Sequence, residues 1–438
     1  MNHNTLNEFR HGLYGCFERA GDALFDLTDA LLTETTARSL IELSLSPLFQ
    51  RQWPSLYEAL EDGRIERSKL RKLLASYAPW PAEGGRVWMG VDASSIARPE
   101  ADTSRDRTPI YVPNLPQSSK PMTLGWQFST LVILPEQPGS GTYILDSQRI
   151  ESSQTAAQVA AQQLAAILPL LPWRVTLVAD RFYGSLVFLR LIAALACDKL
   201  LRLKANRVLY RAAPPRTGKR GAPRKHGARF KCNDASTHGP PDEEWQGSDE
   251  QGQPVEVACW RGLHFREGRD IEVSVMRVIR HGATERKRDP KVSWFLWQGT
   301  APIPLVEVRP GYHRRYSQEH GYRFDKQALL WATPRLRTPE QFERWTDLIA
   351  AVHDEVVLAQ ASGEVCYRPW ENQRRAVTPQ QVRRAMPRIL SKLGTPAKVP
   401  QPRGKSPGRP KGATIRPAPR YPVVKKPKPT PKKQRKRA

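Results

Sequence analysis

Four residues that suit phosphodiester chemistry recur at helical spacing late in the chain. They are Tyr312, Arg315, Glu319 and Lys326, and the successive spacings are three, four and seven residues. At about 100° per residue, they share an arc of roughly 60° on one face of a continuous helix. Glu can hold a metal ion, while Arg and Lys bind phosphate oxygens. A solvated polar face is the alternative, and geometry alone does not separate the two.

Two aspartates, Asp92 and Asp180, each follow an apolar run that is typical of a buried strand. The runs cover residues 87–91 and 174–179. Active sites of α/β sheets gather at strand ends, and phosphodiester cleavage by two Mg²⁺ ions needs clustered carboxylates. Taken singly, either aspartate is better interpreted as a helix N-cap or turn residue. Their repeated context brings the metal-site interpretation level with that alternative.

The elements that would position these acids differ along the chain. Residues 1–82 have helical periodicity and predict a helical region, either a reader of DNA ends or a packing appendage. Residues 83–204 predict three strands and then alternating helix and strand, which indicates an α/β fold with a mixed sheet flanked by helices. Residues 205–302 predict a β-rich insertion. Residues 303–400 predict a helical continuation, with helices over 312–331 and 339–358.

Two stretches have the composition of irregular structure. Residues 99–119 are polar and Pro-rich, which predicts a loop. Residues 401–438 contain 14 Lys or Arg, 9 Pro and no acidic residue, so they predict a disordered basic tail. Within it, residues 407–411 resemble the core of an AT-hook, which lies in the DNA minor groove; a generic basic tail is the alternative.

The overall charge favours a polyanionic partner. The chain has 438 residues and a net charge of +26, which suits nucleic acid, although a ribosome-like or merely soluble basic protein has the same property. The 5 Cys form no CxxC pair, which argues against structural zinc and for a reducing cytoplasm. Apolar runs are too short to span a bilayer. We therefore expect a cytoplasmic protein with no membrane partner, associated with the nucleoid when bound to DNA.

Several segments of the sequence resemble a known protein family. Tyr-x2-Arg-x3-Glu-x6-Lys is the signature of a large group of bacterial insertion-sequence transposases of the DDE kind, and this chain matches all four positions. Residues 90–94, 178–184 and 405–412 are also similar to that group, so the resemblance covers roughly residues 87–412. It implies a ribonuclease-H-like catalytic core interrupted by a β-rich insertion. It also implies Asp92, Asp180 and Glu319 as the catalytic and metal-binding triad.

The resemblance further implies a reaction and its partners. The expected cofactor is a pair of Mg²⁺ ions, for which Mn²⁺ could substitute. The expected activity is cleavage at transposon ends and strand transfer into target DNA, carried out by a homodimer on DNA. Two alternatives stay open: a non-catalytic basic DNA-binding protein, and a ribonuclease-H-like nuclease without strand transfer. Glu371 is a rival third acid, but it lacks an accompanying Arg/Lys face.

Several further residues are candidates for contact with DNA. One basic loop covers residues 221–227 and is either a contact to backbone phosphate or a solvated loop. In the resembled group an aromatic residue of the insertion can stack on a flipped base at the transposon end, which makes Trp294 and Trp297 candidates; core aromatics of a β-rich segment are the alternative. Because Trp294 and Trp297 are three residues apart, they point to opposite faces of a strand. At most one of them is therefore expected to face DNA. Besides the helix-face residues Tyr312, Arg315 and Lys326, the candidates are Arg181, Arg224, Lys225, Trp294, Trp297, Arg409 and Lys411.

Overall fold

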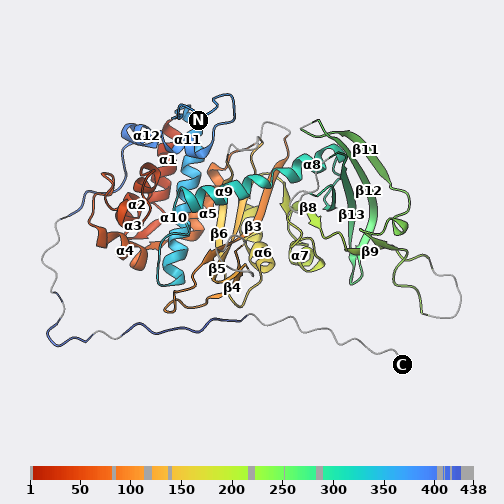
Figure 1. Ribbon diagram of the computed structural model, residues 1–438, viewed down its shortest axis with the longest axis horizontal. Coiled ribbons are helices and arrows are strands. Elements are labelled where there is room, and N and C mark those ends of the chain that lie inside the picture. Colours follow the sequence, from red (N-terminus) through yellow and green to blue (C-terminus); the bar gives the residue numbers. More distant parts are fainter. Residues whose placement is uncertain are drawn as a thin grey trace.

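The computed structural model describes residues 3–80, 85–112, 121–136, 141–215, 222–250, 252–282, 290–401, 408, 410–414 and 417–425. Its N-terminal part is helical, with α1 His3–Tyr14, α2 Gly21–Thr33, α3 Leu40–Leu43, α4 Trp53–Asp62 and α5 Arg67–Tyr77. A small sheet pairs β1 Phe17–Arg19 with β2 Arg64–Ile65. These helices lie beside α10 Pro339–Ala359, α11 Pro379–Arg383 and α12 Met386–Leu393 (Figure 1).

A buried ion cluster joins the two helical groups. Arg10 of α1 lies 2.8 Å from Asp29 of α2 and 2.5 Å from Glu355 of α10. All three side chains are at most 5% exposed, so each charge depends on the others for compensation. The N-terminal helices are therefore fixed to the C-terminal ones.

The centre of the molecule is a mixed sheet. Its strands are β3 Val87–Ala97, β4 Thr108–Tyr111, β5 Met122–Ile133, β6 Tyr143–Ile150, β7 Val175–Ala179 and β8 Cys197–Leu203. Strand β5 is antiparallel to β3, β4 and β6, whereas β3, β7 and β8 are mutually parallel. All five residues of β7 are buried, as expected for a strand covered on both faces. Helices α6 Ala156–Ile167 and α7 Leu186–Leu191 complete the mixed α/β layer, which confirms the predicted ribonuclease-H-like fold class.

The β-rich segment after β8 extends this same sheet. It contains β9 Val208–Arg211, β10 Arg229–Lys231, β11 Glu243–Ser248, β12 Pro254–Phe265, β13 Gly268–Arg280 and β14 Val292–Gln298. Strand β14 pairs antiparallel with β8, from Trp294 opposite Leu203 to Gln298 opposite Lys199. Strands β3 to β14 thus form one 12-stranded sheet, whose green strands curl away at the right of Figure 1.

Three local predictions need correction. The single helix expected over 312–331 is two helices, α8 Leu305–His313 and α9 Tyr316–Gln327, because the backbone tightens into three-residue turns at Arg314 and Arg315. Strand β3 does not end at Asp92 but continues to Ala97, since β5 pairs with it throughout that stretch. Strand β4 lies inside the segment expected to be a loop.

Candidate active site

The two aspartates are adjacent because of the strand register. Val91 of β3 pairs with Ala179 of β7, so Asp92 and Asp180 each lie one residue beyond the last parallel pair. Both line an open cleft with a volume of about 630 Å³. Asp92 Oδ1 accepts a hydrogen bond from the Ala93 amide at 2.8 Å, and Asp180 Oδ1 accepts one from the Phe182 amide at 2.8 Å. These bonds fix both carboxylates at the same sheet edge.

Helix α9 brings the third acid to the same cleft. Glu319 lies in its first turn, and Arg315 precedes the helix as its N-cap. The Arg315 guanidinium donates to Asp92 Oδ2 at 3.0 Å and to Glu319 Oε1 at 3.1 Å. Because the Arg315 side chain is only 12% exposed, it is a shielded bridge between a strand acid and a helix acid.

Four contacts hold α9 against the central strands. The Tyr322 hydroxyl donates to Asp92 O at 2.9 Å, and Lys326 Nζ donates to Ser95 O at 2.9 Å. The Gln318 amide donates to Thr130 O at 3.0 Å. A Cβ at Gly90 would lie 2.7 Å from Gln318 Oε1, so only glycine lets the helix come this close. The helix face is thus positioned by β3 and β5.

The acids perturb one another and their neighbours. Burial raises the pKa of Asp92 to about 6; Asp180 and Glu319 add to the rise, while Arg315 opposes it. Burial also raises the pKa of Tyr183 above its usual range, with further contributions from Asp92 and Asp180, so this phenol lies beside both aspartates. The cleft therefore concentrates negative charge that a cation would stabilise.

Carboxylate oxygens are the ligands that Mg²⁺ prefers, so the chemistry of the three acids fits a divalent metal. Among the residues that the structure describes, however, no three Asp, Glu, His or Cys side chains stand close enough together to hold one ion. Arg315 lies between Asp92 and Glu319 and takes an oxygen of each. A metal ion bound at these acids would therefore compete with the guanidinium for the same two carboxylates.

Comparison with known protein families identifies the family of this chain. The sequence model of the DDE superfamily endonuclease family matches residues 12–264, which is more than half of the chain. The chain belongs to the DDE superfamily endonucleases. No curated protein matches it. The matched region contains Asp92 and Asp180 but ends before Glu319, so the assignment of the third acid depends on the geometry of α9.

The remaining candidates on the helix face line the cleft of the endonuclease. Tyr312 is 6% exposed, and its ring contacts Phe295 and the guanidinium groups of Arg202 and Arg315. Lys326 and the exposed Arg181 also line the cleft. Sequence reasoning missed Tyr183 and Tyr322, although each follows a predicted acid by three residues. Arg202 and Tyr111 also line the cleft, but no sequence pattern indicated them.

Other candidates lie outside the cleft. Arg224 and Lys225 are exposed on the segment before β10, and Lys411 is exposed, whereas Arg409 lies outside the described residues. Trp294 and Trp297 are each 4% exposed and belong to two different core clusters, so neither presents a ring face for stacking. The rival acid Glu371 does not line the carboxylate cleft. Its carboxylate accepts hydrogen bonds from Arg384, Gln381 and the Arg368 amide.

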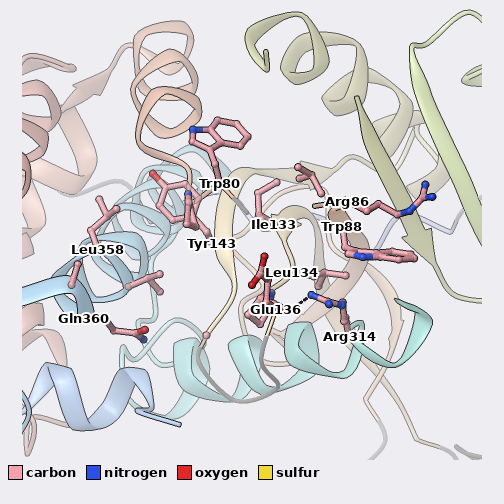
Figure 2. Close-up of a pocket in the computed structure, with 16 residues that line it drawn as sticks. Trp80, Arg86, Trp88, Ile133, Leu134, Glu136, Tyr143, Arg314, Leu358 and Gln360 are labelled. Carbon is pink, nitrogen blue, oxygen red and sulfur yellow. Dashed lines mark hydrogen bonds between the residues drawn. The ribbon is translucent and has the colours of Figure 1, made fainter. Parts of the chain in front are cut away.

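A second pocket adjoins the junction between α8 and α9. It has a volume of about 360 Å³ and is lined largely by apolar side chains, including Trp80, Trp88 and Tyr143 (Figure 2). Arg314 lines this pocket and donates to Pro135 O at 3.0 Å. Its neighbour Arg315 lines the carboxylate cleft instead. These two consecutive arginines therefore line different cavities. Substitution of Arg314 is thus a suitable control for substitution of Arg315.

No helix among the described residues is both long and apolar enough to cross a membrane.

Proposed function

We propose that this DDE endonuclease is a transposase of the insertion-sequence group with the Tyr-x2-Arg-x3-Glu-x6-Lys signature. It would cleave DNA at transposon ends and transfer the freed strand into target DNA. One observation carries the proposal: Asp92 of β3, Asp180 directly after β7 and Glu319 of α9 line a single cleft. A non-catalytic DNA-binding protein has no need of such a set of acids.

Asp92, Asp180 and Glu319 would hold two Mg²⁺ ions, with Mn²⁺ as a substitute. Bound there, the ions would supply Lewis-acid activation of the attacking oxygen and stabilisation of the leaving one. Arg315, released from an acid, would bind a phosphate oxygen with its planar fork of donors. Lys326 would support the same phosphate from the last turn of α9, and Arg181 would contact the DNA strand at the cleft entrance.

The wider assignment follows the same proposal. Residues 83–204 and 303–400 would form the two parts of the catalytic core, 205–302 the insertion, 1–82 an N-terminal helical region and 401–438 a DNA-binding tail. Arg224, Lys225, Arg409 and Lys411 would contact the DNA backbone. The working form would be a homodimer on DNA in the bacterial cytoplasm, associated with the nucleoid. A nuclease without strand transfer is the second candidate, because the family description specifies an endonuclease only.

The test is cleavage and joining with purified full-length protein. The substrate is a duplex carrying the inverted repeat that flanks the coding sequence, and the target is a supercoiled plasmid. Asp92→Asn, Asp180→Asn and Glu319→Gln should each abolish Mg²⁺-dependent cleavage while DNA binding persists. Glu371→Gln is the matched control and should cleave normally.

The outcomes separate the candidates. Wild-type cleavage by any of the three variants removes that residue from the site. Cleaved ends without joined plasmid products would establish the nuclease and refute the transposase. Binding without cleavage by the wild-type protein would refute both.

A further inference from the structure

The N-terminal helices differ in charge from the rest of the chain. Residues 1–62 contain 10 acidic and 4 basic residues and so carry a net charge of −6, whereas the chain as a whole carries +26. Residues 63–438 therefore carry +32. Because the DNA backbone is itself negative, α1–α4 are unsuited to the reading of DNA ends and are better suited to contact with protein. Figure 1 shows α2, α3 and α4 together at the end of the molecule opposite β11, β12 and β13.

Helix α3 and the turn after it are apolar on both sides. Leu40 and Leu43 are at most 3% exposed and pack into the core, which fixes the helix from within. Ile41 and Leu45, by contrast, are 54% and 77% exposed, and Leu48 is exposed as well. We name these three exposed side chains the apolar ridge. A helix that is apolar on its outer side as well as its inner side is expected to be covered by another surface.

A groove adjoins the apolar ridge. It has a volume of about 1070 Å³ and lies between α2, α4 and residues 398–401. Gln50, two residues after Leu48, lines the groove, and so do both chain neighbours of Trp53, whose own side chain is 57% exposed. Val399 also lines it and is exposed. The groove therefore offers apolar side chains to an apolar side chain that enters from outside.

The charges around the ridge and groove are mixed in sign. Residues 34–58 contain three acidic and two basic residues, a net charge of −1. Two copies of this surface can therefore approach each other with little repulsion. Two surfaces formed by residues 63–438 would on average oppose strong positive charge to strong positive charge. Charge thus favours this end of the molecule as the place where two copies meet.

We propose that two copies of this chain associate through this face, with the apolar ridge of each seated in the groove of the other. A ridge and a groove on the same surface make it self-complementary, which a two-fold dimer requires. The inference rests on the proposed function only in that it names the interface of the proposed homodimer, and the dimer would form without DNA. Because Arg10 ties α1 and α2 to α10, the interface would be firmly connected to the catalytic part of each copy.

Sedimentation equilibrium on the full-length protein, without DNA or metal and at high salt, measures this association. High salt screens contacts between charged surfaces but leaves apolar contacts in place. Leu45→Glu puts a charge into the proposed interface. Val306→Glu is the matched control, because Val306 of α8 is 49% exposed but lies outside this face. Circular dichroism and urea midpoints establish that both variants are folded.

The wild-type protein and Val306→Glu should be dimers of equal affinity. Leu45→Glu should raise the dissociation constant of the dimer by roughly thirtyfold or more, which is the effect of losing a central anchor of an interface. A wild-type protein that stays monomeric at all concentrations, or a Leu45→Glu dimer of unchanged affinity, would overturn the proposal.

Disulfide trapping tests the seating of the ridge in the groove. In a background with the exposed Cys366 replaced by serine, a chain with Leu45→Cys is mixed with a chain with Ser55→Cys, since Ser55 lines the groove. Mild oxidation should cross-link the mixture but neither variant alone. An uncross-linked mixture, or Leu45→Cys cross-linked to itself, would refute the reciprocal seating. Neither experiment involves cleavage: a protein that dimerises in this way but cuts no DNA keeps the interface and refutes the transposase, and a monomer that cuts and joins DNA does the reverse.

Discussion

Arg315 contacts two of the three acids and is also proposed to bind the reacting phosphate. Arg315→Gln should therefore tighten metal binding at the acids but slow DNA cleavage. The Arg315 guanidinium lies 3.0 Å from Asp92 and 3.1 Å from Glu319. Its positive charge therefore opposes the binding of a metal ion at these acids. Glutamine keeps a polar side chain of similar length but removes the competing positive charge.

The magnitude follows from the exposure of the partners. Glu319 is 39% exposed, so its bond to Arg315 contributes little. Asp92 is 24% exposed, and a hydrogen bond to a charged group there contributes about 1.5–3 kcal/mol. Its loss should therefore tighten metal binding by roughly tenfold to a hundredfold. The same substitution removes a donor to the reacting phosphate, so single-turnover cleavage should slow by about 10²–10³-fold.

The assay pairs Mn²⁺ titration calorimetry on the DNA-free protein with single-turnover cleavage at saturating metal. Arg314→Gln is the matched control, because that guanidinium donates to Pro135 O in the other pocket. The control should leave metal affinity unchanged. Equal or weaker Mn²⁺ binding by Arg315→Gln would refute the idea that Arg315 competes with the metal.

Two further predictions concern the placement of α9. Gly90→Ala would put a Cβ 2.7 Å from Gln318 Oε1 and 3.0 Å from Leu134, so it should cost about 1–3 kcal/mol of unfolding free energy and reduce cleavage; an unchanged urea midpoint would contradict this close approach. Burial alone would lower the pKa of His353, but Asp325, at 2.6 Å, outweighs it and raises the pKa from 6.5 to about 9. The pair should therefore stabilise the protein fully below pH 6.5 and lose its contribution as the pH rises through about 9. Urea unfolding at both ends of that range would measure this loss of stability. His353→Gln should abolish the pH dependence.

The sequence was sufficient to locate the two aspartates, because a buried strand requires an unbroken apolar run and each run here ends next to an acid. It was not sufficient to place the end of β3. Residues 93–97 continue the strand only because β5 pairs with them, and such pairing is a tertiary effect. The tightened turns at Arg314 and Arg315 were not predicted either, although Pro310 and Gly311 lie one turn earlier, inside α8.

The tryptophans illustrate a different limit. Alternation along β14 correctly predicts that Trp294 and Trp297 point to opposite faces. It cannot reveal that both faces of the strand are covered, one by the cluster with Trp260 and the other by the cluster with Val308. Glu319 was found from its spacing to Arg315 even though the helix is broken, because the tight turns between α8 and α9 keep a helical course.

The pairing of β14 with β8 has a consequence for synthesis on the ribosome. Strand β8 ends at Leu203, but the strand that covers its open edge begins only at Val292. At roughly 5–20 residues per second, the nascent chain carries that edge uncovered for several seconds. A product that stops near residue 264 would contain both aspartates, lack Glu319 and expose a strand edge that invites aggregation. Glu319 follows β14 in the chain, so the three acids would be complete only after the edge of β8 has been covered.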